Sequence, residues 1–234
     1  MARGLLGKKI GMTQVFAEDG SQVGVTAIEA GPCPILSVKD KSLQLGFDVI
    51  VEKKLKKPVA GYFKKVNIAP HKIIKEVSKV AGKEYKVGEE IKADLFKPGD
   101  FVDVTGISIG KGFQGGMKRW HWQGGPETHG STSHRRVGSM GSSTTPGRVF
   151  KGHHLPGHMG AKQVTVQNLE VIKVDLDHNI LLIKGAVPGF DNCYLVVNRA
   201  KKRKSRVEKP QAAPVAKATA VKPAAKPAAA KAKK

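Results

Sequence analysis

The stretch of sequence that decides the fold runs from Val164 to Lys184 and reads VTVQNLEVIKVDLDHNILLIK. Its outer parts, 164–174 and 180–184, are rich in β-branched and apolar residues, which favour strands. Between them lies the pentapeptide DLDHN at 175–179, a polar segment typical of a chain reversal between antiparallel strands. The stretch therefore predicts a β-hairpin within an antiparallel sheet.

Short segments of the same kind recur on both sides of this hairpin. They contain β-branched or alternating apolar residues and are separated by turn residues, such as those at 18–20 and 97–100. The strands predicted in this way are 10–16, 23–28, 43–51, 90–95, 101–104 and 194–197. Many short strands at close spacing predict a mainly β protein whose body, residues 1–109 plus 163–199, is a small antiparallel barrel.

Residues 53–88 within this body follow a different pattern. Several apolar residues fit the spacing of one helix face, namely Ile73, Ile74, Val77, Val80 and Ala81. The segment 72–77 fits a strand equally well, because it is short and contains β-branched residues. We therefore predict an α+β insertion here and leave the choice between helix and strand open.

The net charge is +22 at pH 7, and most of it lies in two segments. Residues 110–162 hold eight Lys or Arg against the single acid Glu127, a net charge of +7. Residues 200–234 hold twelve against Glu208, a net charge of +11, and the remaining chain has 21 basic and 17 acidic residues. Such charge opposes compaction unless something anionic neutralises it, so a nucleic acid or an anionic membrane surface is the expected partner.

Membrane-spanning and disulfide-rich proteins are disfavoured. No run approaches the roughly 18 consecutive apolar residues of a spanning helix, and residues 1–9 lack the apolar core of a signal peptide. Cys33 and Cys193 show no Cys-x-x-Cys spacing and are expected to be small buried residues. A reducing cytosolic or organelle-matrix setting fits this cysteine usage best.

Residues 110–162, which we call the extension, differ in composition from the body. They contain no Ile and a single Leu, but 13 of the 27 glycines and six of the eight histidines. A segment of this length without periodicity is typically either functional or disordered. Its large aromatic residues, Phe113, Trp120, Trp122 and Phe150, argue against a simple flexible linker.

Residues 200–234 form a basic tail of low complexity. The segment begins with Lys201-Lys202-Arg203-Lys204 after Ala200 and continues as repeats of Ala, Lys and Pro. We expect it to be disordered when free and to contact phosphates without sequence specificity.

The extension matches no familiar catalytic or metal-binding pattern. Its histidines are irregularly spaced and lack neighbouring cysteines, which disfavours zinc. Gly112 follows Lys111 where a phosphate-binding loop of the Walker type needs Ser or Thr, and the spacing of the glycines is too short. Gly138-Ser139-Met140-Gly141 lacks the spacing of a serine-nucleophile turn. We therefore expect no enzyme, no metal and no cofactor.

Contact with folded RNA explains the composition better. Glycines let the backbone approach phosphates, Lys and Arg bind them, and Trp and His rings stack on unpaired bases. For one Trp the alternative is packing against the body, because His121 would place the two rings on opposite sides of an extended chain. The candidate RNA-binding residues are Lys8, Lys9, Lys111, Lys118, Arg119, Trp120, His121, Trp122, His129, His134, Arg135, Arg136, Arg148, Lys151, His153, His154, His158 and Lys162.

Motifs in a characteristic order run from the N-terminus to about residue 199. They are GKKIGMTQVF at 7–16, DVTG at 103–106, GKGFQG at 110–115, MKRW at 117–120, THG at 128–130, SHR at 133–135, TPGRVFKG at 145–152, GHMG at 157–160, VTVQNL at 164–169 and KGAVPG at 184–189. Taken together, they resemble the bacterial form of the large-subunit ribosomal protein L3 family.

The resemblance implies a translation-factor-type barrel with an α+β insertion, and an extension that reaches toward the peptidyl-transferase centre. It implies a structural protein that binds 23S rRNA near its 3′ end early in subunit assembly and touches ribosomal proteins fourteen and nineteen. It further implies a cytoplasmic, ribosome-bound protein without membrane or small-molecule ligands. Two departures stand out: Thr144 occupies a position where many bacterial members carry a methylated Gln, and the tail exceeds the usual family ending.

Two other functions compete with this interpretation. The histone-like tail suggests a nucleoid-type DNA-binding protein, but a DNA compactor has little use for a long Gly/His/Trp loop, whereas a crevice in folded RNA accommodates one. An enzyme would need a pocket of perturbed acids, which the composition of the extension does not supply.

Overall fold

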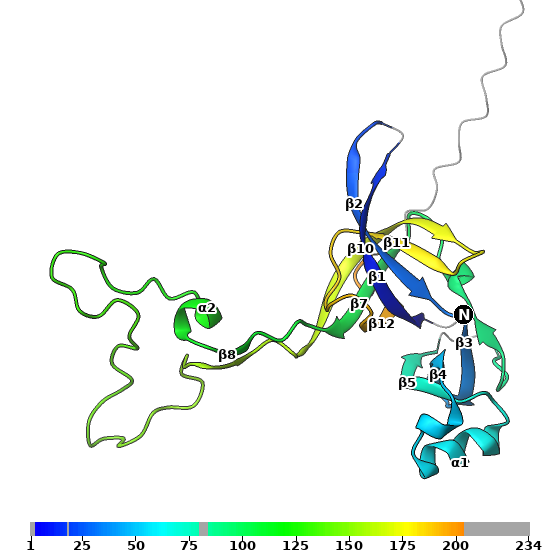
Figure 1. Ribbon diagram of the computed structural model, residues 1–234, viewed down its shortest axis with the longest axis horizontal. Coiled ribbons are helices and arrows are strands. Elements are labelled where there is room, and N and C mark those ends of the chain that lie inside the picture. Colours follow the sequence, from blue (N-terminus) through cyan, green and yellow to red (C-terminus); the bar gives the residue numbers. More distant parts are fainter. Residues whose placement is uncertain (1–2, 18, 80–83, 204–234) are drawn as a thin grey trace, which may run out of the picture.

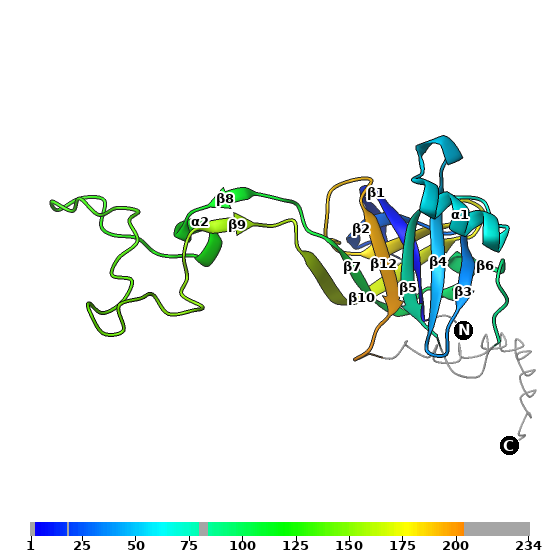
Figure 2. The same ribbon diagram turned by 90° about the horizontal axis from the view of Figure 1, so that it is seen from below.

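The body of the protein is a closed antiparallel β-barrel, seen on the right of Figure 2. The computed structural model describes residues 3–17, 19–79 and 84–203. Around the barrel the strand order is β1-β12-β7-β10-β11-β2, and β2 pairs with β1 to close it. These strands are β1 (Gly4–Phe16), β2 (Gln22–Ala30), β7 (Phe101–Ile107), β10 (Gln163–Asp175), β11 (Ile180–Lys184) and β12 (Tyr194–Arg199).

The hairpin predicted from residues 164–184 is confirmed. β10 and β11 pair in antiparallel register, with Asp175 opposite Ile180 and Val174 opposite Leu181. Leu181 and Ile183 are fully buried, and they alternate along β11 with the less buried Ile180 and Leu182. The other predicted barrel strands also exist, although β1 begins at Gly4, six residues before the predicted start.

A buried carboxylate accepts a hydrogen bond from the backbone of a bulge in β10. The β7–β10 register shifts between Val166 and Leu169, and Asn168 there has a positive φ of 59°. The Asn168 backbone N–H donates to Asp103 Oδ1 over 2.9 Å, and the Lys201 N–H donates to Asp103 Oδ2 over 3.2 Å. A bulge leaves a backbone group without its ladder partner, so this carboxylate replaces the missing acceptor inside the fold.

Beside the barrel lies a four-stranded sheet in the order β5-β4-β3-β6 (Figure 1). The elements of this part are β3 (Cys33–Val38), β4 (Ser42–Val49), the 3-10 helix Glu52–Lys54, α1 (Lys57–Val66), β5 (His71–Ser78), β6 (Glu90–Ile91) and the 3-10 helix Ala93–Leu95. The α+β unit therefore takes in β3 and β4 as well as the expected insertion at 53–88. Residues predicted as one strand at 90–95 divide into β6 and a 3-10 turn.

The ambiguous segment at 72–77 is a strand, so its helical alternative is wrong. β5 pairs with β4 along its whole length, and these backbone hydrogen bonds outweigh the helical spacing of Ile73, Ile74 and Val77. Val80 and Ala81, the other members of that stripe, lie outside the described residues, as does the basic tail from 204 onward. The helix of the unit is instead α1, which ends where Asn67 adopts the left-handed conformation.

Both cysteines are buried, as predicted. Burial raises the pKa of the Cys33 thiol to about 12, and burial also raises the pKa of the Cys193 thiol. In the described part of the chain, no helix is long and apolar enough to cross a membrane.

The barrel interior is expected to supply most of the stability. Leu195 of β12 is 1% exposed and lies in the main apolar cluster with Leu5, Val104 and Leu181. We expect Leu195→Ala to lower the free energy of unfolding by about 2–5 kcal/mol, because it removes buried methyl groups and leaves a cavity. Leu176, 59% exposed in the β10–β11 turn, provides the control, and Leu176→Ala should change it by less than about 0.5 kcal/mol. Urea titration followed by circular dichroism measures both; equal losses would contradict this view of the core.

Candidate nucleic-acid interface

The extension is an excursion between two neighbouring barrel strands. β7 enters it and β10 leaves it, and these strands pair with Ile107 opposite Gln163 and Gly106 opposite Val164. Backbone bonds continue outward, from the Ser108 N–H to the Lys162 carbonyl over 2.9 Å and from the Lys111 N–H to the Met159 carbonyl over 2.9 Å. The short strands β8 (Gly112–Gln114) and β9 (Gly157–Met159) then pair with each other. We call residues 108–114 and 157–162 the neck; Figure 2 shows it leading away from the barrel.

A glycine makes the neck possible at its tightest point. Gly160 has a φ of +77°, and a Cβ added there would lie 2.1 Å from the Ile109 carbonyl oxygen. No other residue fits between these two segments without moving the backbone. At this position the glycine therefore allows the outgoing and returning segments of the neck to pack closely.

Beyond the neck, four residues hold the two sides of the extension together. Arg119 Nη1 and Trp120 Nε1 both donate to the Leu155 carbonyl, over 2.7 and 2.9 Å. The Trp120 indole stacks on the His154 imidazole with ring centroids 4.0 Å apart and planes 6° from parallel. We call Arg119, Trp120, His154 and Leu155 the junction. It joins α2 (Gly116–Trp120) to the returning chain.

Trp122 packs within the extension as well. His121 adopts the left-handed conformation that ends α2, with a φ of 59°, so the chain turns back after Trp120. The Trp122 ring consequently lies over Gly116, where an added Cβ would meet ring carbons at 2.1–2.4 Å. The proposed packing of one Trp against the body is wrong, because α2 stands clear of the barrel (Figure 1) and both rings contact residues of the extension.

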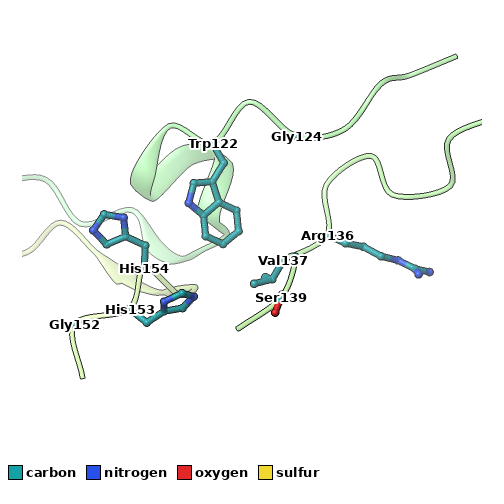
Figure 3. A pocket seen from close by; sticks show the side chains of 9 residues that line it. Trp122, Gly124, Arg136, Val137, Ser139, Gly152, His153 and His154 are labelled. Atoms are coloured by element: carbon teal, nitrogen blue, oxygen red, sulfur yellow. The ribbon is translucent and has the colours of Figure 1, made fainter. Parts of the chain in front are cut away.

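A hollow of about 610 Å³ opens beside Trp122. In Figure 3 the rings of Trp122 and His153 border it, Val137 lies across from them, and Arg136 extends away from Trp122. The residues that line it are Trp122, Gly124, Arg136, Val137, Gly138, Ser139, Gly152, His153 and His154. The hollow thus combines flat rings with backbone and a cationic residue at its rim.

The cations of the extension face solvent. Lys111, Lys118, Lys151 and Lys162 are exposed, and so are Arg135, Arg136 and Arg148. None of these takes part in an ion pair among the described residues. Arg119 differs, because it is half-buried and its guanidinium serves the junction. The exposed charges are therefore available to an anionic partner.

The histidines are spread over the extension. His121, His129, His134, His153, His154 and His158 are all exposed, although His154 is stacked in the junction. His134 Nδ1 lies 2.9 Å from the Pro126 carbonyl, which fixes its ring. Among the described residues, no three His, Cys, Asp or Glu side chains come together in a way that could hold a metal ion.

Lys9 requires a correction. It is 8% exposed, and its ammonium donates to the Gly189 carbonyl over 3.1 Å and lies 3.7 Å from an Asp191 oxygen. A cation used in this way is not available to RNA. The alternation of side chains along a strand could have predicted this burial, because Lys9 shares a face of β1 with the buried Leu5. Lys8, half-buried on the other face, stays a candidate.

Several exposed apolar residues of the extension were missed as candidates. Phe113 is 77% exposed and Phe150 63%, and Met140 and Val149 are also solvent-facing. The Arg148 guanidinium carbon lies 5.8 Å from the Phe150 ring centroid, so a cation and a ring are presented together. Large apolar side chains exposed in this number commonly mark a surface that a partner covers. Their position among arginines and lysines in the sequence could have identified them as candidate binding residues.

Comparison with known proteins gives a consistent result. The family model described as ribosomal protein L3 matches residues 63–177. Three bacterial proteins named large ribosomal subunit protein uL3 are similar over most of their length. That of Brachyspira hyodysenteriae is 46% identical, covering 87% of this chain and 96% of its own. That of Carboxydothermus hydrogenoformans is 49% identical, covering 87% and 100%, and that of a Geobacillus species is 50% identical, covering 88% and 100%.

The packing of Trp122 on Gly116 can be tested by adding one methyl group. We expect Gly116→Ala to displace the Trp122 ring, because its Cβ would overlap the ring, and so to shift tryptophan fluorescence to longer wavelength. Gly115→Ala is the matched control, since nothing lies within 4 Å of a Cβ at that position. The urea midpoint of the barrel should not change in either variant. Identical spectra for the two variants would show that Trp122 does not pack there.

Proposed function

The chain belongs to the ribosomal protein L3 family, and from this premise we propose that it is a structural component of the large ribosomal subunit that binds 23S rRNA through its extension. The observation that carries the proposal is the extension itself: a cationic, glycine-rich segment held away from the barrel, with its charges unpaired.

Electrostatics support an RNA partner. With eight Lys or Arg and one Glu, the extension repels itself unless phosphates enter between its cations. Each phosphate neutralised by a Lys or Arg releases counterions, which makes binding favourable and dependent on salt. Arg135 and Arg136 lie next to each other and are both exposed, so they can contact adjacent phosphates.

The shape of the extension favours RNA over duplex DNA. Readers of the DNA major groove insert a regular helix or a two-stranded ribbon. Here α2 has five residues and its Arg119 is engaged at the junction, and the β8–β9 ribbon has only three residues in each strand. The chain from 121 to 156 has neither helix nor strand. An irregular, glycine-rich chain with exposed rings suits the crevices and unstacked bases of folded RNA. A nucleoid-type role therefore ranks second.

The hollow beside Trp122 is suited to a single unstacked nucleotide. Its volume of about 610 Å³ falls within the roughly 300–1,000 Å³ of typical small-ligand pockets. The Trp122 and His153 rings offer stacking surfaces for a base, and Arg136 at the rim offers a phosphate contact. These roles are binding and positioning, and no step of covalent chemistry is assigned to them.

Family resemblance supplies finer proposals. The extension would reach toward the peptidyl-transferase centre, and binding would occur near the 3′ end of 23S rRNA, early in assembly. The closed barrel would be of the translation-factor type, and ribosomal proteins fourteen and nineteen would be neighbours. Thr144 is exposed and has no side-chain amide, so the Gln methylation of relatives would be absent at this position.

The contribution of Arg135 and Arg136 is measurable from the salt dependence of binding. We expect Arg135→Ala/Arg136→Ala to weaken binding to 23S rRNA. The slope of log affinity against log salt should flatten by about 0.7–0.9 for each phosphate that is no longer neutralised. Lys53→Ala/Lys54→Ala removes the same charge from exposed positions on the α+β unit and should leave the slope nearly unchanged.

Filter binding over a range of salt concentrations measures both variants. An unchanged slope in the arginine variant would show that these residues do not touch phosphate. Equal affinity of the unmodified protein for duplex DNA and for 23S rRNA would favour the nucleoid-type alternative.

A further inference from the structure

The β1–β2 hairpin continues past the barrel wall. β12 pairs with β1 only from Gly4 to Lys8, and β11 pairs with β2 only from Val25 to Glu29. The pairing between β1 and β2 goes on to Phe16 opposite Gln22. Residues 10–16 and 22–24, which we call the arm, therefore form a two-stranded ribbon without a further strand on either side among the described residues. Figure 1 shows it rising above the barrel.

One face of the arm carries exposed apolar side chains. Met12 and Phe16 share a face because side chains alternate along a strand, and they are 57% and 66% exposed. Their cross-strand partners are Thr26 and Gln22. Between them lies Gln14, opposite Gly24, and its side-chain carbonyl accepts a hydrogen bond from the Gln22 side-chain amide. Ile10, near the base of the arm, is also about half exposed. An isolated two-stranded ribbon is marginally stable in water, so this arm gains from a partner that covers it.

The arm itself contains no charged residue, and the connection between its two strands is acidic. From residue 10 to residue 24 there is no Lys or Arg, and the only charged residues are Glu18 and Asp19. The Asp19 carboxylate accepts hydrogen bonds from the Ser21 hydroxyl and backbone N–H over 2.7 and 3.0 Å. These bonds lower the pKa of Asp19, and an aspartate is negative at neutral pH even without them. RNA phosphates would be repelled by this local negative charge, whereas basic side chains of a protein would be attracted.

We propose that the arm is a docking surface for a different protein, one that is positively charged and presents an apolar patch. Met12 and Phe16 would enter that patch, and the Asp19 carboxylate would face its basic residues. The proposal rests on the proposed function, because basic proteins lie next to one another in a ribonucleoprotein particle such as the large subunit. It separates two surfaces of one chain: the extension for RNA and the arm for protein.

Site-specific cross-linking in the assembled particle tests the proposal. Phe16 is replaced by photo-activatable p-benzoylphenylalanine, and large subunits that contain this chain are irradiated. We expect an adduct with another protein of net positive charge, identified by mass spectrometry. An adduct with rRNA, an adduct with a second copy of this chain, or no adduct at all would overturn the proposal.

The same substitution at Phe150, 63% exposed in the extension, distinguishes this failure from failure of the proposed function. We expect position 150 to cross-link to rRNA. If position 16 reaches a basic protein while position 150 does not reach rRNA, the docking surface stands and the RNA role of the extension fails. If the chain is absent from large subunits, the proposed function fails, and the docking proposal with it.

A variant pair measures the apolar contribution. Met12→Ser/Phe16→Ser removes two apolar anchors. It should therefore reduce, roughly tenfold, the amount of the partner protein (the one identified by cross-linking) that stays bound to salt-washed subunits. Val51→Ser is the control: it replaces a side chain that is 64% exposed on the α+β unit. All three positions are solvent-facing, so circular dichroism should show folded protein in each case. Equal retention in both variants would contradict the role of the arm.

Discussion

The antiparallel pairing of β7 with β10 is the constraint on which the rest of the structure depends. It closes one side of the barrel, and it also fixes the two ends of the extension side by side. Because the ladder continues outward through Ser108 and Lys162, the neck leaves the barrel in a set direction. A flexible attachment would let the extension sample many directions, whereas a barrel seam presents it as an ordered projection.

The extension contains one part held by internal contacts and another part whose side chains are exposed. The junction ties α2 to Leu155 through two hydrogen bonds and a ring stack. Beyond it, the described cations have no ion-pair partner, and Phe113 and Phe150 are largely exposed. Such a surface is costly for a free protein but suits one that is completed by a polyanion. The arm differs from the extension, because it carries exposed Met12 and Phe16 and no Lys or Arg, and we propose that it serves a protein partner instead of RNA.

Much of the fold could be predicted because its signals are local. The turn at 175–179 and the β-branched runs beside it indicate the hairpin without further context. β3 was missed because Pro34 disfavours a strand, although it is tolerated in the short pairing with β6. The choice at 72–77 depended on pairing with β4, which sequence spacing does not contain. Likewise, the positive charge of the extension could be predicted from its composition. The burial of Lys9 depends on tertiary contacts, and the turn at His121 depends on backbone conformation, so neither could be predicted in this way.

Hydrogen exchange of the free and the rRNA-bound protein, followed by mass spectrometry, tests the central claim most directly. In the free protein the amides of the extension between 121 and 156 are mostly outside regular structure and should exchange quickly, while those of the barrel exchange slowly. On binding 23S rRNA, strong protection should appear across the extension, with little change in β11 and β12. Protection confined to the barrel, with the extension still exchanging as in the free protein, would contradict the account.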